Sequence, residues 1–449
     1  MRFLSNPSRP RVAIIGFGYV GSCLGVTLAE RGVSVIGIDS NASLVGELRA
    51  GRSPIPEPGL SDALARLADD PALTVTTDHD RVRDADVVII TVGTPVDEHG
   101  VLLVEQLEEV CLRLSTRLRA GQLVLLKSTV SPGTTRETVV PLLERGGLAQ
   151  GRDFGLAFCP ERLAEGAALA QLRELPVVVG GCDEHSTAAA AEFWRRSLGV
   201  EVHTAPSVET AEVVKLATNW WIDANVAMAN ELARFCSLFD VDVLDVITTA
   251  NALPKGTGHV NILLPSVGVG GSCLTKDPWM AWRAAADRGT ALHTVETARR
   301  VNDGMPEHTY QTIRDELVKL GKDPAGATIA VLGAAFKNDT GDLRNTPVKP
   351  VVDALRAEGA TVRLFDPLAD PAEMRALFGA GAATLREAVA GVDCVAVLAG
   401  HRLFRELDFA ELSTAVTQPC LVFDGRAYYS PERIGELRGL GFAYRGVGR

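Results

Sequence analysis

The sequence predicts an α/β protein with two doubly wound domains joined by a long central helix. Three observations lead to this: residues 11–40 follow a strand–glycine turn–helix–strand order, residues 327–367 repeat that order, and residues 207–239 show an unbroken helical pattern. Strands that alternate with helices form parallel sheets covered by helices. We expect a first domain over residues 1–206, a central helical region over residues 207–321 and a second domain over residues 322–449.

Composition and charge narrow the classes of function. With 449 residues, 46% of them hydrophobic, the chain is large enough for two or three domains with cores of their own. The net charge of −11 argues against a general nucleic-acid binder, which needs an excess of basic residues. A small anionic ligand remains possible, because it needs only a local pocket.

The N-terminus and the cysteines predict a cytoplasmic protein. The opening MRFLSNPSRP lacks the apolar core of a signal peptide, and no apolar run approaches the roughly 18 residues of a membrane span. The eight cysteines are scattered singly with no CxxC pair, so we expect reduced thiols and no metal site.

The first unit of the chain contains a glycine fingerprint. Gly16, Gly18 and Gly21 follow an apolar run of strand length, a helical stretch comes next, and a second apolar run ends at Asp39. This is the Rossmann arrangement, in which the glycines admit a pyrophosphate at a helix N-terminus. Asp39 would bind the adenosine ribose and repel a 2′-phosphate, which favours NAD over NADP.

Two further strands are predicted in this domain. Residues 84–95 and 123–135 each read as a buried strand followed by a loop of small and hydroxyl residues. Thr94, Pro95, Ser128 and Thr129 stand at these strand ends, where parallel sheets bind ligands. On spacing alone, they are equally well read as cofactor-site residues or as plain loop residues.

The central helix is predicted from residue 207 to residue 239. It contains no Pro or Gly and is too apolar to be covered by one small domain, so we expect it to bridge two domains or to build a homodimer. Glu212, Lys215 and Asn219 share one face at helical spacing. The pattern alone favours a solvated stripe over a functional site.

The second α/β domain follows a linker at residues 321–327. Gly333 keeps the place of a turn glycine, but the turn reads GAAFK, so a second NAD is not expected there. We expect a different phosphate-bearing ligand at this turn. Residues 393–401 and 420–426 read as further strands.

Residues 268–279, GVGGSCLTKDPW, place Cys273 among glycines and shortly before Lys276 and Asp277. A reactive thiol needs nearby charge or a proton acceptor. A Gly-rich turn around an inert cysteine is the other interpretation, and this segment does not decide between them.

Eight motifs in register resemble the UDP-glucose/GDP-mannose dehydrogenase family of nucleotide-sugar 6-dehydrogenases: GFGYVG, VGTP, KSTVSPGTT, CPERLAEG, KLATNWWIDANVAMANELA, SVGVGGSCLTKDPW, FKNDTGDLR and FDGR. GGSCLTKD resembles the UDP-glucose enzymes, whereas FCPER, AMANELA and VNILLP resemble the N-acetylhexosamine enzymes. The resemblance implies two Rossmann-like domains and an NAD-dependent, four-electron oxidation of a nucleoside-diphospho-hexose at C6 to the uronate. The first expectation is UDP-glucose to UDP-glucuronate, with a UDP-N-acetylhexosamine or TDP-glucose as alternatives.

The resemblance also implies roles for single residues. Cys273 would form the thiohemiacetal and thioester, while Lys215 and Asn219 would hold the developing oxyanion. Asp277 would accept a proton, and Glu161 would be the general base with Thr129 holding water. NAD would be bound by Gly16, Phe17, Gly18, Tyr19, Val20, Gly21, Asp39, Thr94, Pro95, Ser128, Thr129, Glu165, Lys276 and Arg344. The nucleotide sugar would be bound by Glu161, Arg162, Leu163, Glu165, Lys215, Asn219, Lys255, His259, Leu264, Ser266, Gly268, Gly270, Phe336, Lys337 and Arg426.

Two positions depart from the family pattern. The family usually has an Arg before the catalytic loop, donated across a dimer, and here LPKGTGHVN offers only Lys255 and His259. Leu44 stands where a basic residue often follows the ribose-binding acid.

A two-electron hydroxyacid-type dehydrogenase would not need Cys273, and a silent nucleotide sensor would not need Cys273, Lys215 and Asp277.

Overall fold

The computed structural model describes residues 3, 10–97, 99–379 and 381–449. By its internal contacts the chain divides into two compact units, Met1–Thr218 with Trp279–Ala291, and Asn219–Pro278 with Leu292–Arg449. The chain therefore passes from one unit to the other three times, and both units are assembled from separate stretches of sequence.

The first unit is built on an eight-stranded sheet in the order β3-β2-β1-β4-β5-β6-β7-β8. The pairs are parallel except for β6 with β7, which is antiparallel, so the expected parallel sheet carries one reversal. The strands are β1 (Arg11–Ile15), β2 (Ser34–Ile38), β3 (Leu73–Thr76), β4 (Val87–Ile90), β5 (Leu123–Leu126), β6 (Gly155–Phe158), β7 (Val177–Gly181) and β8 (Val202–Thr204).

Both faces of this sheet are buried. Along β1, Val12 and Ile14 belong to one hydrophobic cluster and Ala13 and Ile15 to another, and β4 and β5 alternate in the same way. This explains why these strands are continuously apolar in sequence. The helices of the unit are α1 (Tyr19–Glu30), α2 (Ala42–Arg49), α3 (Leu60–Leu67), α4 (Glu105–Ser115), α5 (Val140–Glu144), α6 (Ala168–Glu174) and α7 (Glu184–Leu198).

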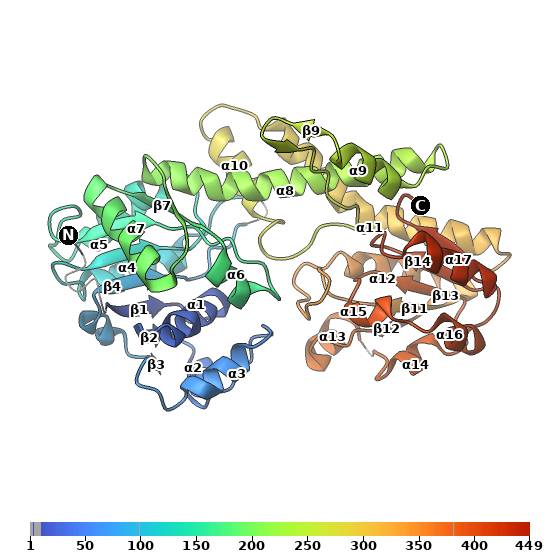
Figure 1. The fold of residues 1–449 in the computed structure, drawn as a ribbon, viewed down its shortest axis with the longest axis horizontal. Coiled ribbons are helices and arrows are strands. Elements are labelled where there is room, and N and C mark those ends of the chain that lie inside the picture. The colour runs from blue at the N-terminus through green and yellow to red at the C-terminus, as the bar shows by residue number, and fades with distance from the viewer. Residues whose placement is uncertain (1–2, 4–9, 98, 380) are drawn as a thin grey trace. The chain divides into compact units, whose positions relative to one another are not determined.

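The long helix α8 (Val208–Ser237) links the two units, as the sequence predicts (Figure 1). It is followed by α9 (Val243–Asn251), a short hairpin of β9 (Pro254–Lys255) and β10 (Gly258–His259), and α10 (Asp277–Ala286). A second long helix, α11 (His293–Lys319), is not anticipated by the sequence analysis. It contains Pro306, which a sequence pattern treats as a helix breaker.

The second unit contains the predicted second sheet, with five parallel strands in the order β12-β11-β13-β14-β15. Its strands are β11 (Thr328–Leu332), β12 (Thr361–Phe365), β13 (Cys394–Val397), β14 (Leu421–Asp424) and β15 (Ala443–Gly446). The helices around it are α12 (Val348–Glu358), α13 (Pro371–Phe378), α14 (Leu385–Val389), α15 (Arg402–Arg405), α16 (Phe409–Ala415) and α17 (Pro431–Gly439).

This sheet also has a core on each face, because alternate residues of β11 and β13 fall into two separate clusters. The sequence-based expectation of two doubly wound Rossmann-like domains and a linking helix is thus confirmed. Among the helices of the described residues, none joins the length and the apolarity that crossing a bilayer requires.

Candidate active site

The turn between β1 and α1 has the shape that a dinucleotide needs. Gly16 adopts φ +86°, where a side chain would be strained, and a Cβ on Gly21 would lie 2.2 Å from the Gly16 carbonyl oxygen. A Cβ on Gly18 would meet no other protein atom within 4 Å. The three glycines therefore serve turn geometry, open approach and close helix packing, which are the properties a bound pyrophosphate requires.

Asp39, at the end of β2, is tied to the same turn. Its carboxylate accepts hydrogen bonds from the Phe17 amide (2.8 Å) and the Asn41 amide (2.9 Å). The helix begins at Tyr19 with Gly18 as its N-cap and no side-chain cap, so its first amides are not claimed by a capping side chain. These features fit NAD.

Glu57 joins this turn to the segment after β6, a role that sequence reasoning missed. Its buried carboxylate accepts the Tyr19 hydroxyl and the amides of Gly166 and Ala168, both at 2.8 Å. Burial and the Glu57 carboxylate raise the pKa of Tyr19, so the hydroxyl remains a donor. The partners Tyr19 and Gly166 belong to the GFGYVG and CPERLAEG motifs, but Glu57 itself lies in a loop with no recognisable pattern.

The hydroxyls at the ends of β4 and β5 bond to the neighbouring loop. Thr94 donates to the Thr129 carbonyl (2.6 Å), and Ser128 donates to the Val92 carbonyl (2.7 Å). Thr94 and Ser128 are buried. The two loops expected to carry cofactor residues are therefore fastened together, in the same unit as the glycine turn.

Glu161 is held by three neighbours in the first unit. The amides of Arg162 and Leu163 donate to its carboxylate at 2.6 and 2.7 Å, and Lys127 Nζ lies 3.3 Å from its other oxygen. Lys127 is 4% exposed and lies 5.1 Å from the centre of the Trp194 ring. Sequence reasoning missed Lys127, although it opens the KSTVSPGTT motif.

The polar residues of α8 are buried, which corrects the expectation of a solvated stripe. Glu212, Lys215 and Asn219 are 0%, 6% and 8% exposed. Glu212 accepts the Gly133 amide (2.6 Å) and the Thr135 amide (2.9 Å), which anchors α8 to the turn after β5. The helical pattern gave the shared face correctly but could not show that other elements cover it.

Cys273 lies just before α10, in the second unit. It is exposed, and its carbonyl accepts the amides of Lys276 (3.1 Å) and Asp277 (2.8 Å). The fully buried Asp277 carboxylate accepts Asn219 Nδ2 and Lys276 Nζ, both at 2.6 Å. The structure thus gathers four predicted site residues of this unit around the start of one helix.

Cys273 is the one exposed cysteine in the described part of the chain. Burial raises the pKa of Cys159 to about 11 and that of Cys111 and Cys420 to about 12. Those thiols are shielded and poorly ionised at neutral pH.

The glycines before Cys273 pack against the chain itself. A Cβ on Gly268 would lie 2.9 Å from Pro347, and one on Gly270 or Gly271 would lie within 2.8 Å of atoms in residues 336–347. These contacts explain the glycines by close packing of two protein segments.

The segment after β11 brings further predicted residues beside that loop. The Gly271 amide donates to the Arg344 carbonyl (3.0 Å), while the exposed Arg344 side chain pairs with Asp342. Arg426 donates to the carbonyls of Leu398 (2.7 Å) and Phe336 (3.0 Å), and burial lowers the pKa of Arg426 to about 10. Both hydrogen bonds go to neutral acceptors, which leave the guanidinium charge uncompensated.

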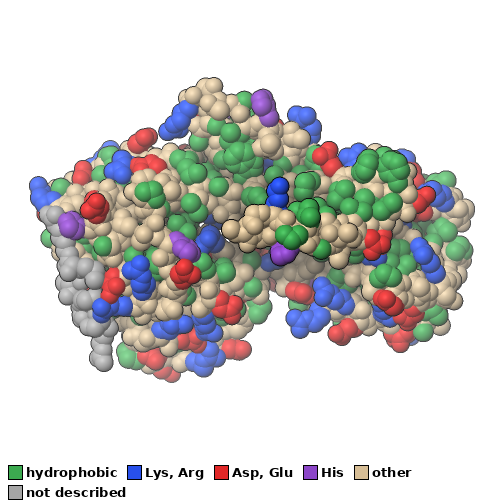
Figure 2. Space-filling model, turned by 45° about the horizontal axis from the view of Figure 1, so that its top comes forward, with side chains coloured by type: hydrophobic (Ala, Val, Ile, Leu, Met, Phe, Trp, Pro, Cys, Tyr) green, Lys and Arg blue, Asp and Glu red, His purple; other side chains and the backbone are tan. Residues whose placement is uncertain are grey.

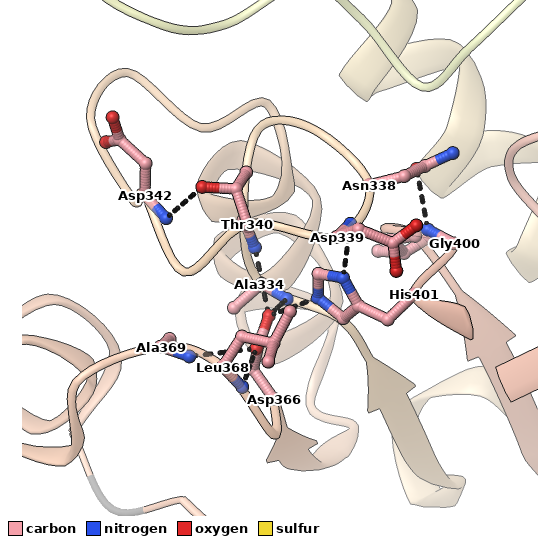
Figure 3. Close-up of polar contacts among 12 residues, drawn as sticks. Ala334, Asn338, Asp339, Thr340, Asp342, Asp366, Leu368, Ala369, Gly400 and His401 are labelled. Carbon is pink, nitrogen blue, oxygen red and sulfur yellow. Dashed lines mark hydrogen bonds and ion pairs between the residues drawn. The ribbon is translucent and has the colours of Figure 1, made fainter. Parts of the chain in front are cut away.

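A buried histidine fastens the loop that carries Phe336 and Lys337 (Figure 3). His401 Nδ1 accepts the Asp339 amide (2.9 Å), so its Nε2 is the protonated nitrogen and donates to Asp366 (2.9 Å). Asp366 stands at the end of β12, as Asp39 does at the end of β2. Here its carboxylate also accepts the amides of Ala334, Ala335, Leu368 and Ala369.

The remaining predicted substrate residues are placed differently. Lys255 and His259 lie exposed on the β9–β10 hairpin, and Leu264 is also exposed. Ser266 is buried, and its backbone amide donates a hydrogen bond to Asn230 Oδ1 (2.8 Å).

Comparison with known proteins covers nearly the whole chain. The UDP-glucose/GDP-mannose dehydrogenase family matches in three parts: its NAD-binding domain over residues 10–198, its central domain over residues 209–304 and its UDP-binding domain over residues 330–431. The boundaries expected from the sequence are not tested by these matches and remain a prediction.

Similar proteins come from archaea and bacteria. The UDP-N-acetyl-D-mannosamine dehydrogenase of Methanococcus maripaludis strain C7 is 32% identical and covers 88% of this chain and 87% of its own length. The UDP-glucose 6-dehydrogenase of Bacillus subtilis is 29% identical over 98% of this chain and 93% of its own. The structure of the UDP-D-ManNAc dehydrogenase of Pyrococcus horikoshii has a TM-score of 0.86 and 30% identity, over 98% of this chain and 99% of that one.

Proposed function

Since the chain belongs to the UDP-glucose/GDP-mannose dehydrogenase family, we propose that it oxidises the C6 hydroxyl of a UDP-hexose twice, to the carboxylate, through a thioester on Cys273. The observation that carries the proposal is the exposed Cys273 beside a buried Asp277 that bonds both Asn219 and Lys276. A two-electron dehydrogenase has no use for such a thiol.

NAD supplies the hydride acceptor for both oxidations. The chain would hold it at the Gly16, Gly18 and Gly21 turn, with Asp39 at the adenosine ribose. The Asp39 carboxylate would repel the 2′-phosphate of NADP.

In the first oxidation the chain must remove the hydroxyl proton and stabilise the alkoxide. Lys215 and Asn219 donate to the oxygen as its charge develops, and Asp277 accepts the proton. All three are buried, and charge stabilisation is stronger where water is excluded.

In the second oxidation the aldehyde must first become tetrahedral. The Cys273 thiolate forms an S–C6 bond, and the carbonyl oxygen receives the electron pair of the broken π bond. Oxidation of this thiohemiacetal leaves a thioester. Glu161 then takes a proton from water, whose oxygen attacks C6, and the C–S bond breaks to release the uronate and the thiolate.

The relatives favour an N-acetylated sugar. Sequence alone predicts UDP-glucose first, whereas the archaeal proteins described above are UDP-N-acetyl-D-mannosamine dehydrogenases. We therefore expect a UDP-N-acetylhexosamine to be the better substrate. Arg426 and Lys337 supply the positive charge for its diphosphate.

A substrate panel tests this proposal. Purified protein is given NAD with UDP-N-acetylmannosamine, UDP-N-acetylglucosamine, UDP-glucose, TDP-glucose or GDP-mannose, and NADH and uronate are measured. We expect two NADH per sugar, with the highest kcat/KM on a UDP-N-acetylhexosamine. One NADH per sugar, with an aldehyde as final product, would contradict the thioester route.

A homodimer built on α8 completes the proposal. Val213, Trp221, Met228 and Phe235 repeat at helical spacing and are 47%, 49%, 48% and 57% exposed. At about 100° per residue they lie roughly opposite the buried polar stripe. Figure 2, with the α8 side turned forward, shows apolar side chains at the surface. Exposed apolar surface of this kind marks an interface, and a second copy offers the matching stripe.

A further inference from the structure

The buried polar stripe of α8 continues past the proposed catalytic residues. Asp223, one turn after Asn219, is 0% exposed, and Asn230 is also 0% exposed. Neither has a part in the chemistry proposed above. Their partners come from α11 and from the loop that leads to Cys273, all within the second unit.

Asp223 is paired with a buried arginine. Arg299, 2% exposed, donates through Nη1 to Asp223 Oδ1 (2.7 Å), and Asn302 donates to the same oxygen (2.8 Å). Burial raises the pKa of Asp223, and the charge of Arg299 opposes that rise. The pair fixes α11 against α8 at the level of residues 266–274, the loop that carries Cys273 and is called the thiol loop below.

Both ends of the thiol loop are bonded to this network. Arg299 Nη1 also reaches the carbonyl of Leu274, the residue after Cys273, at 3.5 Å. At the other end Asn230 accepts the Ser266 amide (2.8 Å) and donates to Asn302 (2.9 Å). One chain of hydrogen bonds thus runs from the start of the loop, through Asn302, Asp223 and Arg299, to its end.

This network is costly if its purpose is stability alone. Asp223 Oδ2 and Arg299 Nε are buried with no hydrogen-bond partner. Buried ion pairs contribute little net stability, and apolar residues of similar volume often replace them without loss. A directional network does provide fixed geometry, which a reacting atom requires.

We infer that Arg299, held by Asp223, is a positioning residue for Cys273, and that Asn302 and Asn230 extend its hold to Ser266. The inference rests on the proposed thiol chemistry. The network sets where the sulfur lies, while the glycine turn expected to bind NAD, in the first unit, does not depend on it.

The test compares an uncharged pair with a matched control. Asp223→Leu combined with Arg299→Met removes the charges and keeps the volume. Lys322→Met removes another ion pair of the same unit, Lys322 with Asp393 at 2.6 Å. The readouts are NAD and UDP binding, kcat and KM, thermal unfolding, and the iodoacetamide alkylation rate of Cys273 followed by peptide mass spectrometry.

We expect kcat of the double variant to fall by about tenfold to a hundredfold, the size that a misplacement near 1 Å produces. The NAD dissociation constant should stay within about twofold, the alkylation rate should change, and Arg299→Lys should recover part of kcat. Lys322→Met should leave kcat and alkylation as in wild type. Asn230→Ala, which removes the bonds to Ser266 and Asn302 but leaves the ion pair in place, gives the same comparison if the double variant does not fold.

A folded double variant or Asn230→Ala with wild-type kcat and wild-type alkylation would overturn the inference. Failure of the proposed function is a separate result, seen when the wild-type protein forms no second NADH. Alkylation of Cys273 still reports its position in that case.

Discussion

Alanine at two glycines of the β1–α1 turn should separate NAD binding from folding. In Gly21→Ala the new methyl would lie 2.2 Å from the Gly16 carbonyl oxygen, against an ordinary contact of roughly 3.5 Å. The turn must therefore move by roughly 1 Å. Overpacking of this kind costs about 1–3 kcal/mol, and the helix propensity of alanine recovers at most about 1 kcal/mol of it.

Gly18→Ala is the matched change, and we expect it to weaken NAD binding without destabilising the fold. Its methyl would meet no protein atom within 4 Å, and φ is −75°, so stability should change by no more than about 0.5 kcal/mol. The methyl would instead occupy the space through which the pyrophosphate approaches the backbone. We expect NAD affinity to fall while the fold is kept.

Thermal unfolding with and without NAD measures both effects. At a hundred times its Kd, NAD should stabilise the wild type by about 2.7 kcal/mol. Gly18→Ala should unfold like the wild type without NAD and lose this gain, whereas Gly21→Ala should already be destabilised without NAD. An undiminished NAD gain in Gly18→Ala, or a fully stable Gly21→Ala, would refute the assigned roles.

Four other changes have definite expected outcomes. Cys273→Ala should stop at no more than one NADH per sugar, since the other thiols are shielded; full activity would exclude the thioester. Asp39→Ala should lower kcat/KM with NAD more than with NADP, because it removes both the charge and the bond to the turn; an unchanged ratio would contradict this. Phe235→Glu should shift sedimentation toward monomer, with Leu403→Glu, 46% exposed in the second domain, as a control that does not. Burial alone would raise the pKa of Asp366, but the bonds from His401 and from backbone amides outweigh burial and lower this pKa. The ionised carboxylate therefore stabilises the fold above about pH 4, and this stabilisation is lost as the pH falls through the folded-state pKa. Acid unfolding of Asp366→Asn should lack that loss.

The secondary-structure elements that local sequence patterns define could be predicted. The strand–turn–helix order of residues 11–40 and 327–367, and the unbroken α8, follow from apolar runs and glycine placement, so both sheets and the linking helix could be expected. The strand β7 could not be oriented in this way, because an apolar run carries no information on direction. Pro306 concealed α11 for a similar reason, since a pattern reads proline as a boundary.

The candidate site also combines residues that sequence motifs identify with residues that they do not. Cys273, Asp277 and Asn219 could be named from motifs, but the burial of Asn219 depends on elements distant in sequence. Glu57 and Arg299 carry no local signal at all. Each acts through a partner more than 70 residues away, Arg299 on Asp223 (76 residues) and Glu57 on Gly166 (109 residues). Such pairs are visible only once the chain has folded.

The threefold passage of the chain between its two units has a consequence for synthesis. Residues 1–218 leave the ribosome well before residues 279–291, which belong to the same compact unit. The first unit thus lacks Trp279, which packs against Gly100, until most of the central region has also been made. Larger proteins commonly fold domain by domain during synthesis. Here the first unit cannot be completed in this way before residues 279–291 have been made. A fragment ending at residue 218 should be a poor stand-alone NAD-binding protein, whereas one ending after residue 291 contains every segment of that unit.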